Sequence, residues 1–155
     1  MDPVGRAAGF DFRMIHFPQF PRLTPTNHRV TSPPSIVYNC IAWAAGDASI
    51  WWQSGLHWPF ASHPFDDTVE ELKRVFQTLG YEECPAGDLE PGFEKVVLFG
   101  VSGQYTHAAR QLPSGKWTSK LGTEDDIEHD SPETVGGGIY GDVALFLRRQ
   151  LVNPI

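Results

Sequence analysis

The sequence is poor in cysteine, in positive charge and in long apolar runs. Its 155 residues include only 2 cysteines, which are too few for a disulfide framework and favour free thiols in a reducing compartment. No apolar run approaches the roughly 18 residues needed to span a bilayer, and the first residues lack the apolar core of a signal peptide. We therefore expect a cytoplasmic protein without a membrane partner.

The charge balance is acidic. Lys and Arg number 12 against 19 Asp and Glu, so the net charge is −7, and no dense basic cluster is present. Such a chain is a poor partner for nucleic acid or for an anionic membrane. No cofactor is expected either, because the glycines at 136–138 are not followed by the Lys-Ser/Thr pair of a phosphate-binding loop.

Proline separates an N-terminal segment from the rest of the chain. The prolines between residues 18 and 34 remove backbone donors and bias the preceding residues away from helix. We predict an extended Pro-rich arm over residues 1–34 and a single domain over residues 35–155.

Within that domain, helices precede strands. Asn39 is predicted to cap a helix that begins at Cys40, and an apolar stripe predicts a second helix from Asp67 or Thr68 to Gly80. Strands are expected over 94–100, 104–112, 116–121 and 139–149, with an acidic, turn-like stretch over 123–133. This order predicts an α+β fold, in which the first helix packs on the face of an antiparallel sheet.

Cys40 is the candidate nucleophile. A thiol at the head of a helix feels the positive end of the helix dipole and the free backbone amides of the first turn, which favour the thiolate. The same amides, with Asn39 as cap, could receive an oxyanion during attack on a carbonyl. The alternative is that Cys40 is a buried structural cysteine.

His107 is the candidate general base. It lies near the start of a predicted strand and is followed by Ala108 and Ala109, which are small enough for a helix to pack closely. An imidazole held there, facing the head of a helix, would give a Cys–His dyad in which His107 first accepts and then returns a proton. Four other histidines lie in loops and are expected at surface or structural positions: His16, His28, His57 and His63.

Asn39-Cys40 at a helix head, His107 near a strand start and a following hairpin together resemble papain-like thiol hydrolases, and most closely the NlpC-type cell-wall peptidases. The resemblance implies a papain-like fold and a cysteine peptidase or amidase that cleaves a peptide, a peptidoglycan stem or a side-chain amide. In that branch a polar residue about twelve positions after the His orients it, and Ser119 holds this place here. The branch usually has His, Asn or Gln there, so Asp125 and Asp126 are alternative orienters.

Two other functions remain open. One is a catalytically inactive papain-like domain that binds a protein partner, or acts as a toxin or inhibitor module. The other is a metalloprotein using His107 and His129, but the acidic run around His129 has no recognised ligand spacing, so no metal site is predicted. The stretches 38–44 and 117–122 also resemble an uncharacterised bacterial family, which implies no activity.

Overall fold

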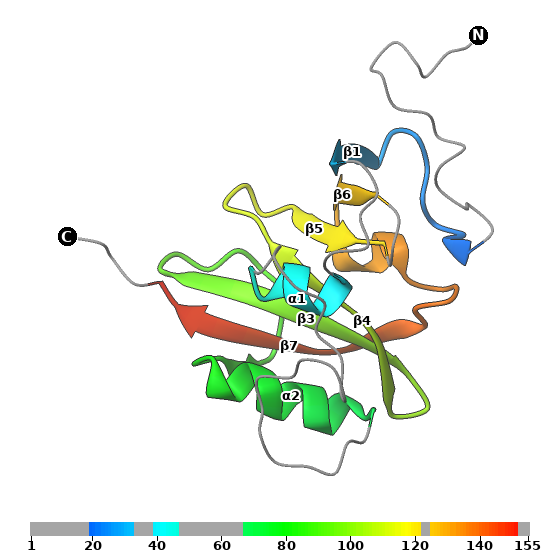
Figure 1. Ribbon diagram of the computed structural model, residues 1–155. Coiled ribbons are helices and arrows are strands. Elements are labelled where there is room, and N and C mark those ends of the chain that lie inside the picture. The colour runs from blue at the N-terminus through cyan, green and yellow to red at the C-terminus, as the bar shows by residue number, and fades with distance from the viewer. Residues whose placement is uncertain (1–18, 33–38, 47–66, 122–124, 152–155) are drawn as a thin grey trace, which may run out of the picture.

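The computed structural model describes residues 19–32, 39–46, 67–121 and 125–151. Within these ranges a seven-stranded antiparallel sheet carries two short α-helices, α1 (Cys40–Ala44) and α2 (Val69–Thr78), as Figure 1 shows. The predicted α+β, papain-like fold with an NlpC-type arrangement is therefore wrong. The described residues form a β-rich fold in which the sheet dominates and α1 spans little more than one turn.

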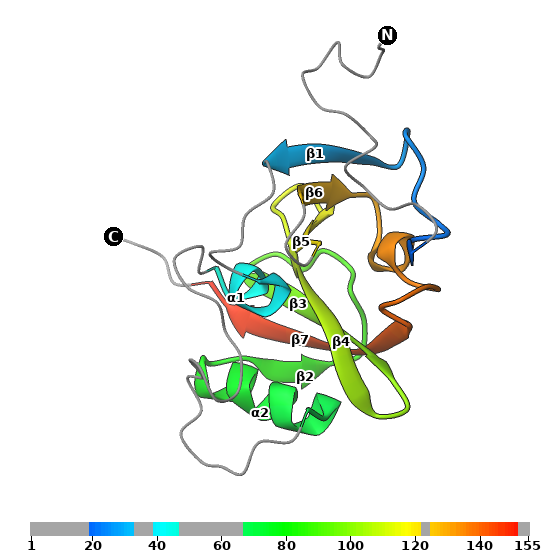
Figure 2. The same cartoon turned by 45° about the vertical axis from the view of Figure 1, so that its right-hand side comes forward.

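The sheet is a meander extended at both edges. Its order is β1-β6-β5-β4-β3-β7-β2, with β1 and β6 at the top of Figure 2 and β2 near the bottom. The consecutive strands β3 to β6 pair with their neighbours, β7 returns to pair with the free side of β3, and β1 and β2 are the edge strands. The strands are β1 (His28–Ser32), β2 (Glu82–Cys84), β3 (Phe93–Val101), β4 (Gln104–Gln111), β5 (Trp117–Lys120), β6 (Asp126–His129) and β7 (Asp142–Gln150).

Two local predictions are confirmed: the helix that follows Thr68, and the two strands over 94–100 and 104–112. Thr68 caps α2 by accepting a hydrogen bond from the backbone N–H of Glu71 (3.1 Å), and the predicted apolar stripe is buried against the sheet. Ser102 and Gly103 have φ angles of 51° and 83°, which is the geometry of a two-residue hairpin turn. This turn joins β3 to β4 where the sequence predicted two strands separated by a tight turn.

Two short strands, β1 and β6, were not predicted. β6 lies in the stretch 123–133 that we expected to be turn-like, and β1 lies in the predicted N-terminal arm. Phe20 and Leu23 are also buried in the core, so residues 19–32 belong to the sheet domain; residues 1–18 and 33–34 of the arm lie outside the described residues. Strands of three to five residues carry little periodic signal, because distant partners determine their pairing.

The two faces of the sheet bury separate cores. The helix face is covered by α1 and α2, and its residues include Val96, Leu98, Ala108 and Leu147. The opposite face is covered by Phe20, Leu23, Val135 and Tyr140, and its residues include Val97, Phe99, Ala109, Trp117 and Ile127. Side chains alternate between faces along each strand, so the face of a residue decides which functional groups it can contact.

No helix in the described ranges is long and apolar enough to cross a bilayer.

Candidate functional site

Cys40 lies at the head of α1, on the helix face of the sheet. The Asn39 side chain accepts a hydrogen bond from the backbone N–H of Ala42 (3.1 Å), so the predicted cap is confirmed. The helix ends at Ala44, and Gly46 follows with a φ of +86°, a left-handed conformation that suits glycine at a helix end. Cys40 packs against the core of the helix face.

The surroundings of the Cys40 thiol disfavour the thiolate, which is the form that acts as a nucleophile. Burial raises its pKa to about 11, although backbone hydrogen bonds from Ala108 and Ile41 and the positive charge of Lys120 act in the opposite direction. Desolvation disfavours the thiolate more strongly than these groups stabilise it. At neutral pH the group is therefore a neutral thiol.

His107 lies on the opposite face of the sheet. Its ring stacks on Tyr140 with centroids 3.9 Å apart and contacts Phe99, its cross-strand neighbour. It is fully buried. The backbone of β4 therefore separates its imidazole from Cys40, and the expected Cys–His dyad does not form in the structure.

The structure does bring His107 together with Ser119. His107 Nε2 lies 2.9 Å from Ser119 Oγ, which lies 2.7 Å from Nε2 of His129, and His129 Nδ1 lies 2.8 Å from the carbonyl oxygen of Ser131. A carbonyl only accepts, so His129 Nδ1 donates, its Nε2 accepts from Ser119, and Ser119 in turn accepts from His107. We call His107, Ser119 and His129 the buried histidine chain.

This assignment leaves one atom of the buried histidine chain without a partner. His107 Nδ1 is a buried acceptor with no hydrogen-bond donor in the structure. Burial lowers the pKa of His129 to about 4, and burial together with the charge of His129 lowers the pKa of His107 well below its ordinary value. Both rings are therefore neutral at pH 7 and sealed from solvent, which suits a structural role.

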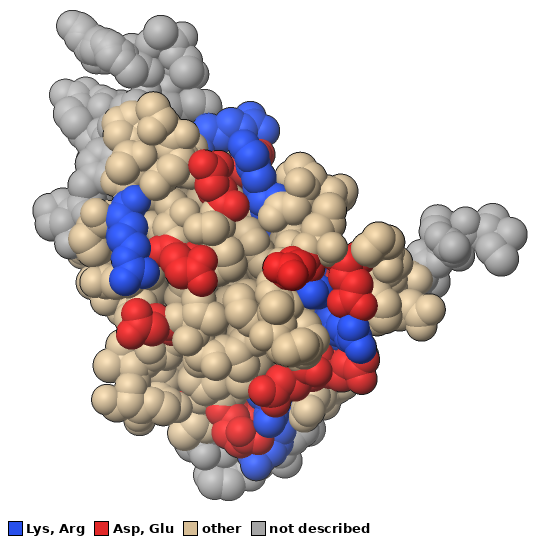
Figure 3. Space-filling view, turned by 180° about the vertical axis from the view of Figure 1, so that it is seen from behind, with Lys and Arg blue, Asp and Glu red and all other residues tan. Residues whose placement is uncertain are grey.

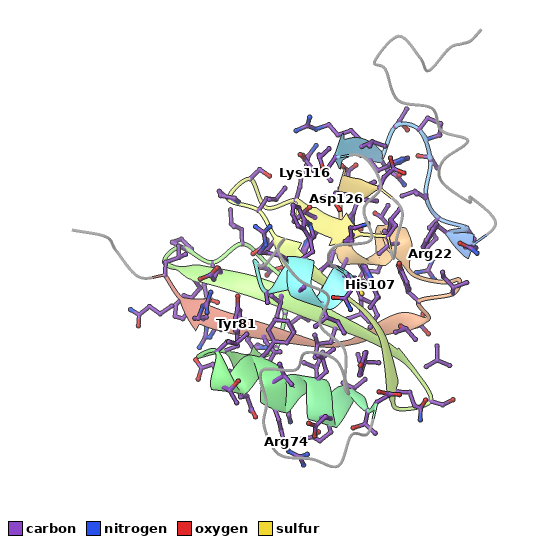
Figure 4. The ribbon with its side chains drawn as sticks, viewed as in Figure 1. Arg22, Arg74, Tyr81, His107, Lys116 and Asp126 are labelled. Atoms are coloured by element: carbon purple, nitrogen blue, oxygen red, sulfur yellow. The ribbon has the colours of Figure 1, made fainter. Side chains whose placement is uncertain are left out.

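The alternative orienters do not reach His107 either. Asp126 precedes Ile127, a residue of the opposite face, so its side chain lies on the helix face, where it is paired in register with Lys120. Figure 4 shows Asp126 on β6, well separated from His107. Asp125 is buried beside this strand. Within the described ranges no group of three or more His, Cys, Asp or Glu side chains could hold a metal ion.

These positions predict slow alkylation of Cys40. At pH 7.5 a thiol with a pKa of about 11 should react with iodoacetamide about two orders of magnitude more slowly than a free cysteine, because only the thiolate reacts. Cys84, whose pKa is also raised by burial, should be slow as well, and both should label equally in urea. Mass spectrometry of time points measures both rates. Selective, rapid labelling of Cys40 would restore the nucleophile hypothesis.

A groove opens at the end of the sheet where β7 finishes; this end of β7 is on the left in Figure 1. β3 pairs with β7 from Phe93 onward but with β4 only from Val96, so the first residues of β3 separate from the end of β4. A cavity of about 500 Å³ lies there, lined by residues 89–94, residues 110–113 and Leu151. We call it the end groove.

The end groove has apolar walls and three charged residues in its lining. Leu89 and Leu151 leave about half of their surface exposed at its rim (52% and 50%). Two of its three charged residues, Glu90 and Glu94, are engaged by cations of the neighbouring strands. The third, Arg110, has no carboxylate partner within the described ranges. On the face seen in Figure 3, acidic and basic side chains otherwise lie side by side.

Sequence reasoning missed the end groove. Its lining comes from three segments that only long-range strand pairing brings together. The available signals were the turn residues Pro91-Gly92 and Pro113, and an arginine within an otherwise small and polar strand. None of these indicates by itself where two strands separate.

Comparison with known proteins identifies a family without a described activity. The family model "Domain of unknown function (DUF7689)" matches residues 29–148, a range that contains α1, α2 and nearly the whole sheet. The chain therefore belongs to this family. No curated protein and no solved structure matched the chain.

Proposed function

We propose that this domain is a binding module that takes an apolar small molecule in the end groove. The observation that carries the proposal is the separation of β3 from β4, which opens a cavity of about 500 Å³ between apolar side chains. Ligand sites in proteins are concave, mostly apolar and roughly 300–1,000 Å³ in volume, with few polar groups. The end groove meets each of these conditions.

The rim of the end groove supports the same proposal. Leu89 and Leu151 are two of the four large apolar side chains that are about half exposed in the described ranges. Covering such a side chain with an apolar ligand contributes about 1–2 kcal/mol, because apolar surface is removed from water. A ligand bridging the two leucines would also cover the apolar wall formed by Phe93 and Leu112.

Amide hydrolysis, the function that the sequence favoured, has weaker support. It needs a thiolate at Cys40 and a base beside it, whereas burial raises the pKa of this thiol to about 11. Of the described histidines, His107 and His129 belong to the buried histidine chain and His28 lies on edge strand β1. The remaining three histidines lie outside the described residues.

A cytoplasmic location forms part of the proposal. Both cysteines are free, and free thiols persist in reducing compartments.

Aspartate substitutions at the rim should weaken ligand binding. Leu89→Asp and Leu151→Asp place a charge against the bound apolar ligand and should each weaken binding of the neutral dye phenylnaphthylamine by about tenfold or more, because ionised carboxylates resist desolvation. Both side chains are about half exposed, so the fold should tolerate the change. Fluorescence titration measures the affinity.

The chain offers matched controls. Val101 and Ile139 are exposed to the same extent, 49% and 50%, but neither lines the end groove. Val101→Asp and Ile139→Asp should therefore bind the dye like the unmodified protein. If all four variants weaken binding equally, or if the unmodified protein binds no dye, the end groove is not a ligand site.

A further inference from the structure

We propose that the apolar ligand of the end groove carries a carboxylate, which Arg110 binds. This inference rests on the proposed function and specifies the chemical class of the ligand, an apolar carboxylic acid. It depends on three properties of Arg110: its position, its support and its charge.

Arg110 lies between the end groove and α1. It lines the groove, and its guanidinium carbon lies 5.5 Å from the centroid of the Trp43 ring. Its Nε donates a weak hydrogen bond to the Trp43 carbonyl oxygen (3.4 Å). Only Nε is used in this contact, so the terminal N–H groups of the guanidinium stay available for two parallel hydrogen bonds to a carboxylate.

Hydrogen bonds hold the Trp43 side chain, which lies beneath the guanidinium of Arg110. Trp43 Nε1 donates a hydrogen bond to Thr118 Oγ1 (3.0 Å), and Thr118 donates to the carbonyl oxygen of Ile127 (3.1 Å). The indole ring is thereby fixed to β5 and β6. An arginine stacked on a fixed aromatic ring loses less side-chain freedom on binding a ligand.

The other charges around the groove are compensated. Arg149 holds Glu94 through Nε and Nη2, at 3.1 and 3.0 Å from the same carboxylate oxygen. Glu90 is held by Arg148 at 2.6 Å and by Lys95 at 3.4 Å. Arg148 also contacts Glu82 (3.3 Å), so three carboxylates are paired with three cations here. Arg110 adds a fourth cation, without a carboxylate partner in the described ranges.

This local excess of positive charge contrasts with a chain of net charge −7. A single uncompensated guanidinium beside apolar walls matches a ligand with one negative charge and an apolar body. A planar carboxylate fits the fork of the guanidinium.

The test compares two ligands of similar shape, one with a carboxylate and one with a neutral amide in its place. These are naphthoate and naphthamide, and calorimetry at pH 7.5 gives the ratio of their affinities for the full chain. The unmodified protein should bind naphthoate about tenfold more tightly, the gain expected of a charge-assisted pair. In Arg110→Gln this ratio should fall towards one, and in Arg110→Lys it should be intermediate, because lysine keeps the charge but not the fork.

Arg74→Gln is the control for the lost charge. Arg74 lies on the outer side of α2, away from the groove (Figure 4), and its one ion pair within the described ranges is with Glu71; this variant should keep the tenfold preference. If naphthamide binds as tightly as naphthoate, the carboxylate inference is overturned while the end groove remains a ligand site. If neither compound binds, both proposals fail. If Arg110→Gln still prefers naphthoate to naphthamide, another cation binds the carboxylate, and the proposed role of Arg110 is wrong.

Discussion

Lowering the pH from 7 to 5 is expected to decrease the free energy of unfolding of this protein, by about 2 kcal/mol through His129 and further through His107, which acts in the same direction. The pKa of His129 is about 4 in the folded protein, against an ordinary value of 6.5, and that of His107 is also well below its ordinary value. Total stabilities of roughly 5–15 kcal/mol are usual, so this loss would remove a large part of the stability.

The sign follows from the protons bound in each state. Between pH 6.5 and 4 the unfolded chain binds protons on both imidazoles, whereas the folded chain keeps them neutral. Stability is therefore fully present above pH 6.5 and falls as the pH drops towards the folded pKa. His28, whose pKa is also lowered by burial, acts in the same direction. Most carboxylates stay ionised down to about pH 5, so they contribute little in this range.

Urea titrations at pH 7, 6 and 5 measure the effect. Between pH 6 and 5 the free energy of unfolding should fall as the pH drops, because the unfolded chain binds more protons than the folded chain. The variant His107→Phe keeps an aromatic ring on Tyr140 and leaves the hydrogen bond from Ser119 to His129 in place. Its stability should depend less steeply on pH. If stability does not depend on pH, or if both proteins show the same slope of unfolding free energy against pH, the buried histidines are not neutral in the folded protein as inferred.

The sequence predicted the features that depend on neighbouring residues. The Asn39 cap, the helix after Thr68 and the β3–β4 hairpin are set by local hydrogen bonds, apolar periodicity and turn residues. The face occupied by His107 was not predictable in this way. Ala108 and Ala109 are both small, so the sequence does not show which of them faces α1. A shift of one residue moves every side chain of a strand to the other face.

The strand pairing places His107 on the face opposite Cys40, which explains why the dyad does not form. The register of β3 with β4 shifts between Phe99 and Gly100, so that Thr106 is passed over and His107 is paired with Phe99 on the opposite face. Ala108 consequently lies under α1, and its backbone rather than an imidazole contacts the Cys40 thiol. The stretch from Asn39 to Trp43 is thus chemically important in a different way, because the capped helix holds Trp43 beneath Arg110.

Replacing Ser119 with alanine is expected to destabilise the protein by about 2–4 kcal/mol, because two buried groups then lose their hydrogen-bond partner. Ser119 is fully buried and joins Nε2 of His107 to Nε2 of His129. Ser114→Ala is the matched control: its hydroxyl accepts from the backbone N–H of Lys116 in an exposed turn, and its loss should change stability by about 0.5 kcal/mol or less. Urea denaturation at pH 7.5 measures both.

The double variant Ser119→Ala/His107→Phe distinguishes a broken hydrogen bond from a simple cavity. Removing the imidazole also removes the Nε2–H that lost its acceptor, together with Nδ1, which has no partner in the folded protein. The double variant should therefore be less destabilised than the sum of the two single variants, by about 1 kcal/mol or more. Strict additivity would mean that the hydrogen bond between His107 and Ser119 does not stabilise the protein, and that Ser119 acts through its hydrogen bond to His129 and its volume.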